Sequence, residues 1–498
     1  MENNYDIVII GSGLGGLECA LILSKEGYKV CVLEQSSVFG GCLQSFSRNN
    51  INIDTGIHYI GSMDDGQIMS QYLKYFGILD QIPTTKLDND FDSISLKGIG
   101  EFSYQHGYDD FIASLTSIFP TERDGLIRYC NKIREIGSSI STDVHKKGTF
   151  SLGGIDNLSI SAADFIDNCV SDPILRNVLA GTNVLYGGIR KSSNLYHHAM
   201  INHSNIEGSY RFVGGTQQVA NMLVQKIRSN GGTVRNRSKV VHLAAEASKV
   251  KFVELDNSEK IYGKYIISDI HPSSTFAMLS ATTNIKKAYK TRLNTLPNTY
   301  GLFSVYLLMK PNSFPYINKN HYFYHNQNVW DTVLDKPDLM PKSIMLSTQL
   351  SNKEAKFSDV VTLMSPINND IFDLWKDTTL GNRGSEYEEI KEIITNNIID
   401  YASEFCVGLN GSIEHIYSAS PLTYLHYTGT PKGSAYGIVK DYKNTLATLL
   451  PTRTKIDNLF LTGQNVNVHG ALGVTLTAAT TCSELLGEEY LAKKIGGA

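Results

Sequence analysis

Hydrophobic and polar positions alternate along the first part of the chain in blocks that predict a strand, a helix and a second strand. Residues 6–10 (DIVII) form a short apolar run typical of a strand buried on both faces. Residues 17–29 then carry apolar side chains at helical spacing, and Gly27 predicts the end of that helix. A second apolar run, residues 30–34 (VCVLE), predicts the next strand. Two strands joined through a helix predict a parallel βαβ unit.

Three later stretches show comparable patterns. Residues 210–243 contain a glycine pair, a helical pattern and two short strands. Residues 264–272 (KYIISDIHP) predict a strand and a turn, and residues 458–486 run from a short strand through a loop into a helix that begins near Gly470. Another apparent strand lies at residues 50–53 and precedes the unusual string DTGIHYIG.

The first strand leads directly into the glycine-rich string GSGLGG. Gly11, Gly13 and Gly16 satisfy the pattern GxGxxG, in which the glycines permit a tight turn, backbone approach to a pyrophosphate, and close packing of helix on strand. Leu14 and Gly15 complete this turn at the helix N-terminus, whose amides and dipole attract an anion. The stretch therefore predicts a dinucleotide site.

The second strand ends on Glu34, followed by Gln35, where a carboxylate can accept hydrogen bonds from a ribose. This unit does not separate NAD from FAD, because both contain an ADP half. A Gly40-Gly41 pair and Cys42 follow shortly after it. Together these residues resemble the extended ADP-binding signature of the flavoprotein superfamily that holds amine oxidases, phytoene desaturases and GDP dissociation inhibitors. The resemblance implies FAD as the cofactor.

Two further segments resemble FAD-binding parts of the same superfamily. Residues 210–243 are similar to the second FAD segment of phytoene desaturases, in which a valine of the returning strand contacts the adenine through its backbone, and Val240 is the matching residue. Residues 458–486 are similar to the segment at the pyrimidine end of the isoalloxazine, where a helix dipole stabilises the negative charge of reduced flavin. The resemblance thereby assigns to the cofactor Gly463, Gln464, Gly473 and Val474.

The expected fold is α/β: a Rossmann-like FAD-binding domain of the GR2 type built from discontinuous segments, with a mixed α+β substrate-binding domain. We expect the FAD-binding domain at residues 1–75, 205–285 and 450–498. The segments between them, residues 76–204 and 286–449, are richer in Tyr, Phe, Asn and Lys and lack a further glycine fingerprint. We expect these two segments to cap the flavin and to bind the substrate.

The string DTGIHYIG, residues 54–61, sharpens the resemblance, because it marks the retinol saturases, a branch of the phytoene desaturase and carotenoid isomerase group. Residues 186–215 also resemble the saturases in their order of a Tyr-Gly, a His-Ala, an Asn-His and a glycine-rich turn. The saturase signature places a second cysteine and a histidine where this chain has Leu43 and Gln44. That departure leaves the substrate open.

The candidate catalytic residues are His58, Tyr59 and His203. His58 and Tyr59 belong to a stretch whose glycines can bring it under the flavin, and a histidine there more often orients a ligand than acts as an acid. His198 and His203 lie on an expected helix at a spacing that does not share one face well. No paired metal site is expected from them.

Composition narrows the function classes. The net charge of -4, with 42% apolar and 19% charged residues, indicates a globular protein and argues against nucleic acid. Seven scattered cysteines without a CxxC pair predict neither a disulfide framework nor a zinc site. The polar N-terminus lacks a signal-peptide pattern, and no apolar run reaches the ~18 residues that span a bilayer. We expect a cytoplasmic protein, with peripheral membrane contact still open.

The function that these features predict is saturation of a C=C bond in a conjugated polyene or isoprenoid by hydride transfer from N5 of reduced FAD. The reaction needs a positioned proton donor and a dry apolar tunnel. Only one dinucleotide fingerprint is present, so we expect a separate, unidentified electron donor.

Three alternatives remain. Carotenoid or phytoene desaturation and cis-trans isomerisation use the same hydride geometry. A prenyl-lipid binding protein of the GDP dissociation inhibitor type has the same fold without flavin chemistry. Amine oxidation is the third, although the sequence shows no identifiable aromatic cage.

Overall fold

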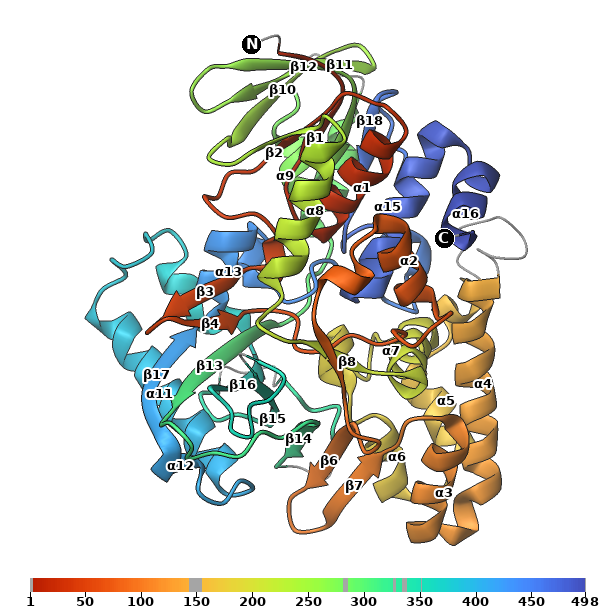
Figure 1. Cartoon of the computed structure of the whole chain (residues 1–498), viewed down its shortest axis with the longest axis vertical. Helices are drawn as coiled ribbons and strands as arrows, with labels where there is room; N and C mark the ends of the chain where they lie inside the picture. Colours follow the sequence, from red (N-terminus) through yellow and green to blue (C-terminus); the bar gives the residue numbers. More distant parts are fainter. Residues whose placement is uncertain are drawn as a thin grey trace.

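Two seven-stranded sheets, one above the other in Figure 1, organise the part of the chain that the computed structural model describes. The described residues are 3–142, 155–280, 285–325, 328–333, 338–350 and 352–497. The upper sheet is Rossmann-like and the lower one is mixed, which confirms the predicted α/β fold class.

The upper sheet has a parallel core in the order β9-β2-β1-β12-β18. These strands are β1 (Asn4–Ile10), β2 (Val30–Leu33), β9 (Thr233–Arg235), β12 (Lys260–Ser268) and β18 (Leu459–Leu461). Strands β10 (Val240–Glu246) and β11 (Lys249–Leu255) extend it in antiparallel order. The sheet therefore unites strands from three distant segments. The domain boundaries themselves stay a prediction.

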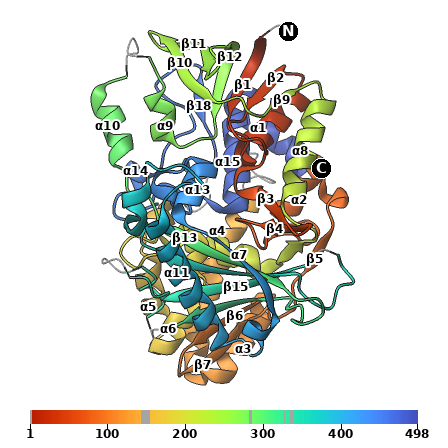
Figure 2. The same ribbon diagram turned by 90° about the vertical axis from the view of Figure 1, so that its left-hand side faces the viewer.

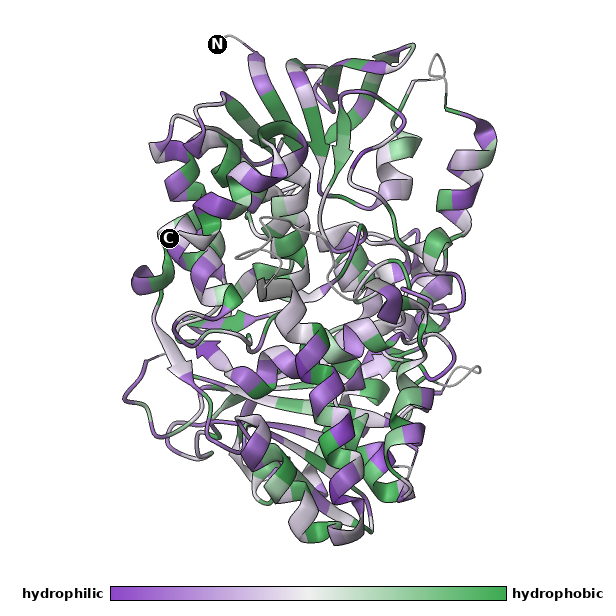
Figure 3. Ribbon diagram, turned by 90° about the vertical axis from the view of Figure 1, so that its right-hand side faces the viewer, coloured by the Kyte–Doolittle hydropathy of each residue, from purple (hydrophilic) through white to green (hydrophobic). Residues whose placement is uncertain are grey.

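One face of the upper sheet is covered by α1 (Leu14–Lys25), which packs against α8 (Gln217–Ser229) and α15 (Gly470–Leu486), as Figure 2 shows. Almost every residue of α1 is buried, which explains why its apolar positions do not form a single stripe. In Figure 3 the hydrophobic colour concentrates in the strands of this sheet, whereas the outer helices also carry hydrophilic residues.

The lower sheet has the order β17-β13-β16-β15-β14-β6-β7. Its strands are β6 (Asp92–Leu96), β7 (Gly100–Tyr104), β13 (Gly301–Met309), β14 (Asn320–Tyr324), β15 (Ser343–Gln349), β16 (Val360–Ile367) and β17 (Ile413–Ala419). Neighbouring strands are antiparallel except β14 and β6, which are parallel. Helix α11 (Ser385–Ser403) packs against β13, β15 and β16.

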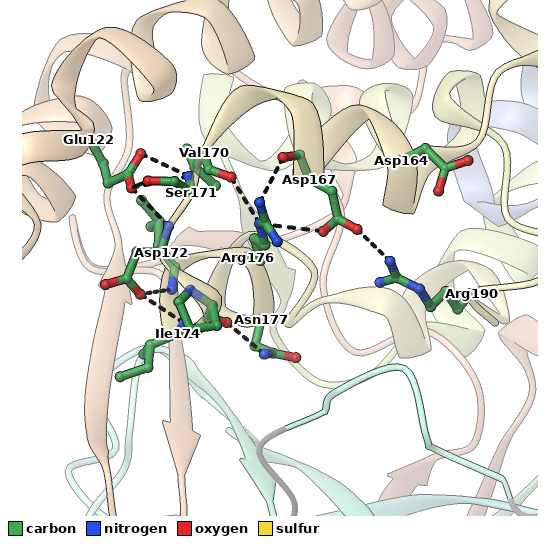
Figure 4. Close-up of polar contacts among 12 residues, drawn as sticks. Glu122, Asp164, Asp167, Val170, Ser171, Asp172, Ile174, Arg176, Asn177 and Arg190 are labelled. Carbon is green, nitrogen blue, oxygen red and sulfur yellow. Dashed lines mark hydrogen bonds and ion pairs between the residues drawn. The ribbon is translucent and has the colours of Figure 1, made fainter.

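A helical layer flanks the lower sheet on the right of Figure 1. Its helices are α3 (Tyr108–Ile118), α4 (Arg123–Thr142), α5 (Ala162–Cys169), α6 (Pro173–Leu179) and α7 (Leu195–Glu207). Figure 4 shows how the turn between α5 and α6 is held: the Glu122 carboxylate accepts hydrogen bonds from the amide of Ser171 at 3.1 Å and the amide of Asp172 at 2.8 Å. Asp172 in turn caps α6 by accepting from the Ile174 amide at 2.8 Å. These hydrogen bonds fasten the α5–α6 turn to the start of α4.

Two small antiparallel pairs connect these parts. Strands β3 (Ser45–Arg48) and β4 (Ile51–Asp54) form a hairpin, and β5 (Thr84–Lys86) pairs with β8 (Tyr210–Phe212). The remaining α-helices are α2 (Ile68–Phe76), α9 (Pro272–Ala277), α10 (Lys287–Thr295), α12 (Leu409–Ser412), α13 (Pro421–Thr428), α14 (Thr445–Thr448) and α16 (Glu488–Gly496). Within the described ranges, none of the helices has both the length and the apolar character to cross a membrane.

Candidate active site

A cavity of about 650 Å³ is lined by residues of both sheets and of the loops and helices between them. Its upper wall lies at the carboxyl ends of β1 and β2, where ligands bind in open α/β sheets. Most of the cofactor residues expected from the sequence line it: Gly11, Gly13, Leu14, Gly15, Glu34, Gln35, Gly41, Cys42, Val240, Gly463, Gln464, Gly473 and Val474. The cavity thus brings together residues from all three segments.

Gly16 does not line the cavity but lies beneath the glycine loop. A Cβ atom at this position would overlap the carbonyl oxygen of Gly11. The absence of a side chain therefore lets the helix approach the strand, as the GxGxxG pattern implies.

Two helix N-termini meet at this cavity. Helix α1 begins at Leu14 and α15 begins at Gly470, and the first residues of both line the wall. Each N-terminus presents unpaired amides and the positive end of a dipole. The pair forms a site suited to an anionic ligand group.

Asp269, which directly follows β12, lies against the glycine loop at the N-terminus of α1 and against Gly463 in the loop after β18. It is partly buried at the cavity wall, and desolvation together with the nearby charge of Glu34 raises its pKa to about 7, although the amides of Gly16 and Gly13 donate hydrogen bonds to it and favour the charged form. A Cβ atom at Gly13 would lie 2.5 Å from its Oδ2. Sequence reasoning missed this residue as part of the site; its position at the end of a central strand was the available signal.

The Glu34 carboxylate also lies at the cavity and is held by serine donors. Ser12 donates to its Oε2 from the amide at 2.9 Å and from the hydroxyl at 2.6 Å, and the Ser36 amide donates to Oε1 at 2.8 Å. The glycine pair after it packs on the fingerprint loop, since a Cβ at Gly41 would lie 3.0 Å from Gly13 Cα. Glycine is therefore needed at both places for close backbone approach.

The string DTGIHYIG begins with a structural carboxylate. Asp54 ends β4 and accepts hydrogen bonds from the Ser45 hydroxyl at 2.7 Å and the Thr216 amide at 2.8 Å. Thr216 immediately precedes α8, so Asp54 fastens the start of that helix to the β3–β4 hairpin.

The rest of this string, residues 55–61, forms a loop that lines the cavity. Its glycines are in close contact with other backbone: a Cβ at Gly56 would lie 2.7 Å from the Cys42 carbonyl oxygen, and one at Gly61 would overlap Ser204 of α7. The glycines thus allow the loop to fit between the dinucleotide wall and α7.

His58 and Tyr59 both lie on the cavity wall. Burial and, to a smaller extent, the charge of Arg211 together lower the pKa of His58 to about 4. The imidazole is therefore neutral near pH 7, and its Nε2 has no hydrogen-bond partner in the described part of the chain. The Tyr59 hydroxyl donates to Asp92 Oδ2 at 2.9 Å and lies 2.6 Å from the Tyr322 hydroxyl.

His203 and His198 do not line the cavity. The Nδ1 atom of His203 lies 2.7 Å from the Tyr108 hydroxyl, and the two ring nitrogens of His198 lie 2.8 Å and 3.0 Å from the hydroxyls of Tyr129 and Tyr186. Both histidines are thus hydrogen-bonded inside the helical layer, and this placement gives His203 no contact with the cavity. Among the described residues no cluster of His, Cys, Asp and Glu suits a metal ion.

The lower part of the cavity is largely apolar. Its wall is formed by Val184, Leu185, Met200, Ile201, Leu302, Met345 and Met364. Tyr424, Tyr427 and Tyr436 add aromatic surface. These residues come from α7, α13, three strands of the lower sheet and the segments before α7 and after α13, which places an apolar compartment against the dinucleotide wall.

The loop before α15 is fixed by a buried lysine. Lys440 donates hydrogen bonds to the carbonyl oxygens of Asn465 at 2.7 Å and Val466 at 3.1 Å, and burial lowers its pKa to about 7. His469 precedes α15 and lies on the cavity wall, with its ring edge against His197 at 4.8 Å between centroids. Burial lowers the pKa of His469 to about 3, so this ring is neutral.

Comparison with known proteins agrees with this geometry. A family model described as NAD(P)-binding Rossmann-like domain matches residues 9–76. An all-trans-retinol 13,14-reductase of Danio rerio is 26% identical over 98% of this chain and 86% of its own length. One from Rattus norvegicus is 27% identical over the same shares. Prolycopene isomerase 2, a chloroplastic protein of an Oncidium hybrid cultivar, is 24% identical over 93% of this chain and 80% of its own length.

Solved structures share the fold over nearly the whole chain. An oxidoreductase from Methanosarcina mazei has a TM-score of 0.62 at 16% identity, covering 95% of this chain and 98% of its own. Wild-type putrescine oxidase bound to putrescine has a TM-score of 0.62 at 14% identity, covering 97% and 99%. The Rab GDI of Plasmodium falciparum reaches 0.50 at 14% identity, covering 97% and 98%. The predicted resemblance is confirmed: the chain is an oxidoreductase with a Rossmann-like flavoprotein fold that resembles the retinol saturase branch of the phytoene desaturase and carotenoid isomerase family.

Proposed function

We propose that this protein is an FAD-dependent oxidoreductase that saturates one C=C bond of a conjugated polyene or isoprenoid. The proposal rests on one observation: the residues expected to bind the dinucleotide and a set of apolar side chains line the same cavity. The similarity to proteins named all-trans-retinol 13,14-reductase supports the substrate class.

The residues of the cradle fit FAD. Gly13, Leu14 and Gly15 leave backbone room for a pyrophosphate, and the Glu34 carboxylate lies where it would accept a hydrogen bond from a ribose hydroxyl. Val240 would hold the adenine, and the α15 N-terminus would meet the flavin ring. Bound reduced FAD would supply a hydride at N5.

The apolar compartment gives the substrate a water-poor site. Methionines such as Met200, Met345 and Met364 have flexible, polarizable side chains that adapt to an elongated apolar ligand. Exclusion of water protects a reduced flavin from side reactions and strengthens the hydrogen bonds of the wall. The chain therefore binds and orients a polyene through shape and apolar contact.

His58 and Tyr59 of the loop have different roles in this proposal. His58 orients the ligands as a neutral imidazole, because its lowered pKa of about 4 leaves it without the acidic imidazolium proton near pH 7. Tyr59 retains a hydroxyl proton throughout this range, since burial raises its pKa well above the ordinary value. Of these two residues, Tyr59 is thus the one that can supply a proton at the cavity wall.

The decisive experiment is anaerobic photoreduction of the FAD-loaded protein, followed by mixing with all-trans-retinol and other polyenes. The expected result is reoxidation of the flavin with one equivalent of a dihydro product. Replacing His58 by Ala should slow this reoxidation while the FAD stays bound, because the loop then loses its orienting imidazole. Reduced flavin that no polyene reoxidises would contradict the proposal.

Isomerisation or desaturation is the second candidate, favoured by the similarity to prolycopene isomerases. Both reactions use the same cavity and cofactor, so product analysis separates them: a cis-trans isomer or a further desaturated polyene replaces the dihydro product. A lipid-binding role without flavin, suggested by the fold shared with a Rab GDI, predicts purified protein without flavin absorbance bands. Saturation needs a separate molecule as electron donor, whereas desaturation needs a separate electron acceptor.

A further inference from the structure

A buried carboxyl group lies behind the cavity wall at Tyr59. Asp92, the first residue of β6, has no exposed surface, and its Oδ2 accepts the Tyr59 hydroxyl at 2.9 Å. Its Oδ1 accepts the side-chain amide of Asn320 at 2.9 Å. Of these two hydrogen-bond partners in the described part of the chain, only Tyr59 lines the cavity.

The groups around Asp92 do not neutralise a full negative charge. The nearest cation, Arg211 of β8, donates to Asn320 Oδ1 at 2.6 Å and therefore reaches Asp92 through a neutral amide. Asn320 and Tyr322 face the carboxyl group from β14, and Tyr104 faces it from β7. A buried carboxylate without a direct ion pair favours its protonated form.

We propose that Asp92 stores the proton of the reduction and delivers it to the substrate through the Tyr59 hydroxyl. This inference rests on the proposed function and identifies the proton source that saturation of a C=C bond requires. The geometry supports it because Tyr59 has the cavity on one side and the buried carboxyl group on the other.

The charge state of Asp92 sets whether Tyr59 can act. When Asp92 is ionised, the Tyr59 proton is engaged by its Oδ2. When Asp92 is protonated, it donates to the Tyr59 oxygen, and the Tyr59 O–H is released from the carboxylate to point toward the cavity or toward the Tyr322 hydroxyl, 2.6 Å away. Burial raises the pKa of Asp92 to about 7, although Asn320 and Tyr59 favour the charged form, so both states are populated near neutrality.

The proton step balances as follows. One new C–H bond forms with the hydride of reduced FAD and the second with the Tyr59 proton, while the π bond is lost and the flavin is oxidised by two electrons. The Asp92 O–H bond breaks as a new Tyr59 O–H bond forms. Asp92 is left as a carboxylate and recovers a proton from solvent before the next turnover.

The test compares the pH dependence of flavin reoxidation in the wild type, Asp92→Asn and Tyr59→Phe. Wild-type reoxidation by a polyene should slow about tenfold per pH unit above pH ~7, because it needs protonated Asp92. Asp92→Asn keeps the size of the side chain and one acceptor oxygen but has no acidic proton to give, so the rate should fall roughly 10²-fold at pH 6 and lose this pH dependence. Tyr59→Phe should show the same loss of rate and of pH dependence, because it lacks the hydroxyl that passes the proton on.

Asp90→Asn is the matched control. Asp90 lies two residues from Asp92 but forms a partly exposed ion pair with Lys319 at 2.7 Å, away from the cavity wall, so its replacement should leave the rate and the pH profile unchanged. Infrared titration measures the protonation of Asp92 independently of catalysis. Asp92→Asn should remove one protonated-carboxyl band that titrates near neutral pH, and Asp90→Asn should not.

The outcomes separate the inference from the proposed function. An Asp92→Asn variant that retains the wild-type rate and pH profile overturns the relay while leaving polyene reduction in place. A wild-type flavin that no polyene reoxidises overturns polyene reduction and the relay together. An infrared band unaltered by Asp92→Asn also overturns the relay, because Asp92 then holds no proton near neutrality.

Discussion

At the scale of single residues, two glycines with the same backbone angle allow the effect of backbone strain to be distinguished from the effect of steric overlap with a neighbouring side chain. Gly463 and Gly27 both have φ of +83°, a conformation that costs a residue with a Cβ roughly 1–2 kcal/mol. A Cβ at Gly463 would also overlap the Asp269 carboxyl group, whereas one at Gly27 would meet open space. We therefore expect Gly27→Ala to lower the free energy of unfolding by about 1 kcal/mol with full FAD content. Gly463→Ala should cost more and lose bound FAD, as measured by urea unfolding and by flavin absorbance.

Equal flavin content in the two glycine variants would show that Gly463 does not lie at the cofactor. Equal losses of bound FAD in the two variants would indicate that backbone strain alone disturbs the site. A second change discriminates further: Asp269→Ala together with Gly463→Ala relieves the overlap and should restore part of the lost stability, because the two side chains meet directly.

At the scale of elements, Asp54 couples strand β4 to helix α8. Its carboxylate accepts the Thr216 amide and the Ser45 hydroxyl, and the side chain is 5% exposed. Asp54→Ala leaves these buried donors without an acceptor, so we expect the free energy of unfolding to fall by about 2 kcal/mol. Asn52→Ala, at an exposed position of the same strand, should change it by less than about 0.5 kcal/mol. Urea unfolding of both variants measures the difference; similar values would show that Asp54 does not anchor α8.

The elements also show how far the sequence can predict this structure. The βαβ unit around Gly13 and the helix near Gly470 were identifiable, because glycine patterns and hydrophobic periodicity act over short distances along the chain. The pairing of β5 with β8 was not, since each strand has three residues and the two lie far apart in sequence. The orientation of His203 depends on which face of α7 meets Tyr108, and the sequence does not specify that face.

The missed part of the candidate site has the same physical origin. Asp92 is an ordinary polar residue in a strand pattern until β6 lies beside β14 and the loop after β4 reaches it. Only that long-range assembly removes water from the carboxyl group and places Tyr59 between it and the cavity. Residue type and local spacing carry no signal of such burial, whereas glycine positions do signal close backbone approach.

At the scale of the whole molecule, a set of histidines is held neutral by burial. Their pKa values are lowered from 6.5 to about 3 or 4, with desolvation as the first cause; the set is His58, His106, His198, His203, His271, His321 and His469. Asp92 and Asp269 have the opposite effect on the pH dependence of stability, because burial raises their pKa from 3.8 to about 7. The pH dependence of stability therefore reflects two groups of opposite sign.

The histidines should dominate below pH 6.5. An unfolded chain binds protons at these rings from pH 6.5 downward and the folded chain does not, so each ring lowers the free energy of unfolding by about 1.4 kcal/mol per pH unit. Asp92 and Asp269 stabilise the folded protein at low pH, and this contribution is lost as the pH rises through 7. Because there are only these two aspartates in the comparison and seven histidines, the histidines determine the overall trend. Thermal unfolding should therefore shift steeply to lower temperature between pH 6.5 and about 4. In the His203→Gln variant the new side-chain amide can still form a hydrogen bond with Tyr108. Acid unfolding of this variant should take up about one proton fewer than unfolding of the wild type. An unfolding temperature that stays level or rises on acidification would mean that these rings are charged inside the folded protein.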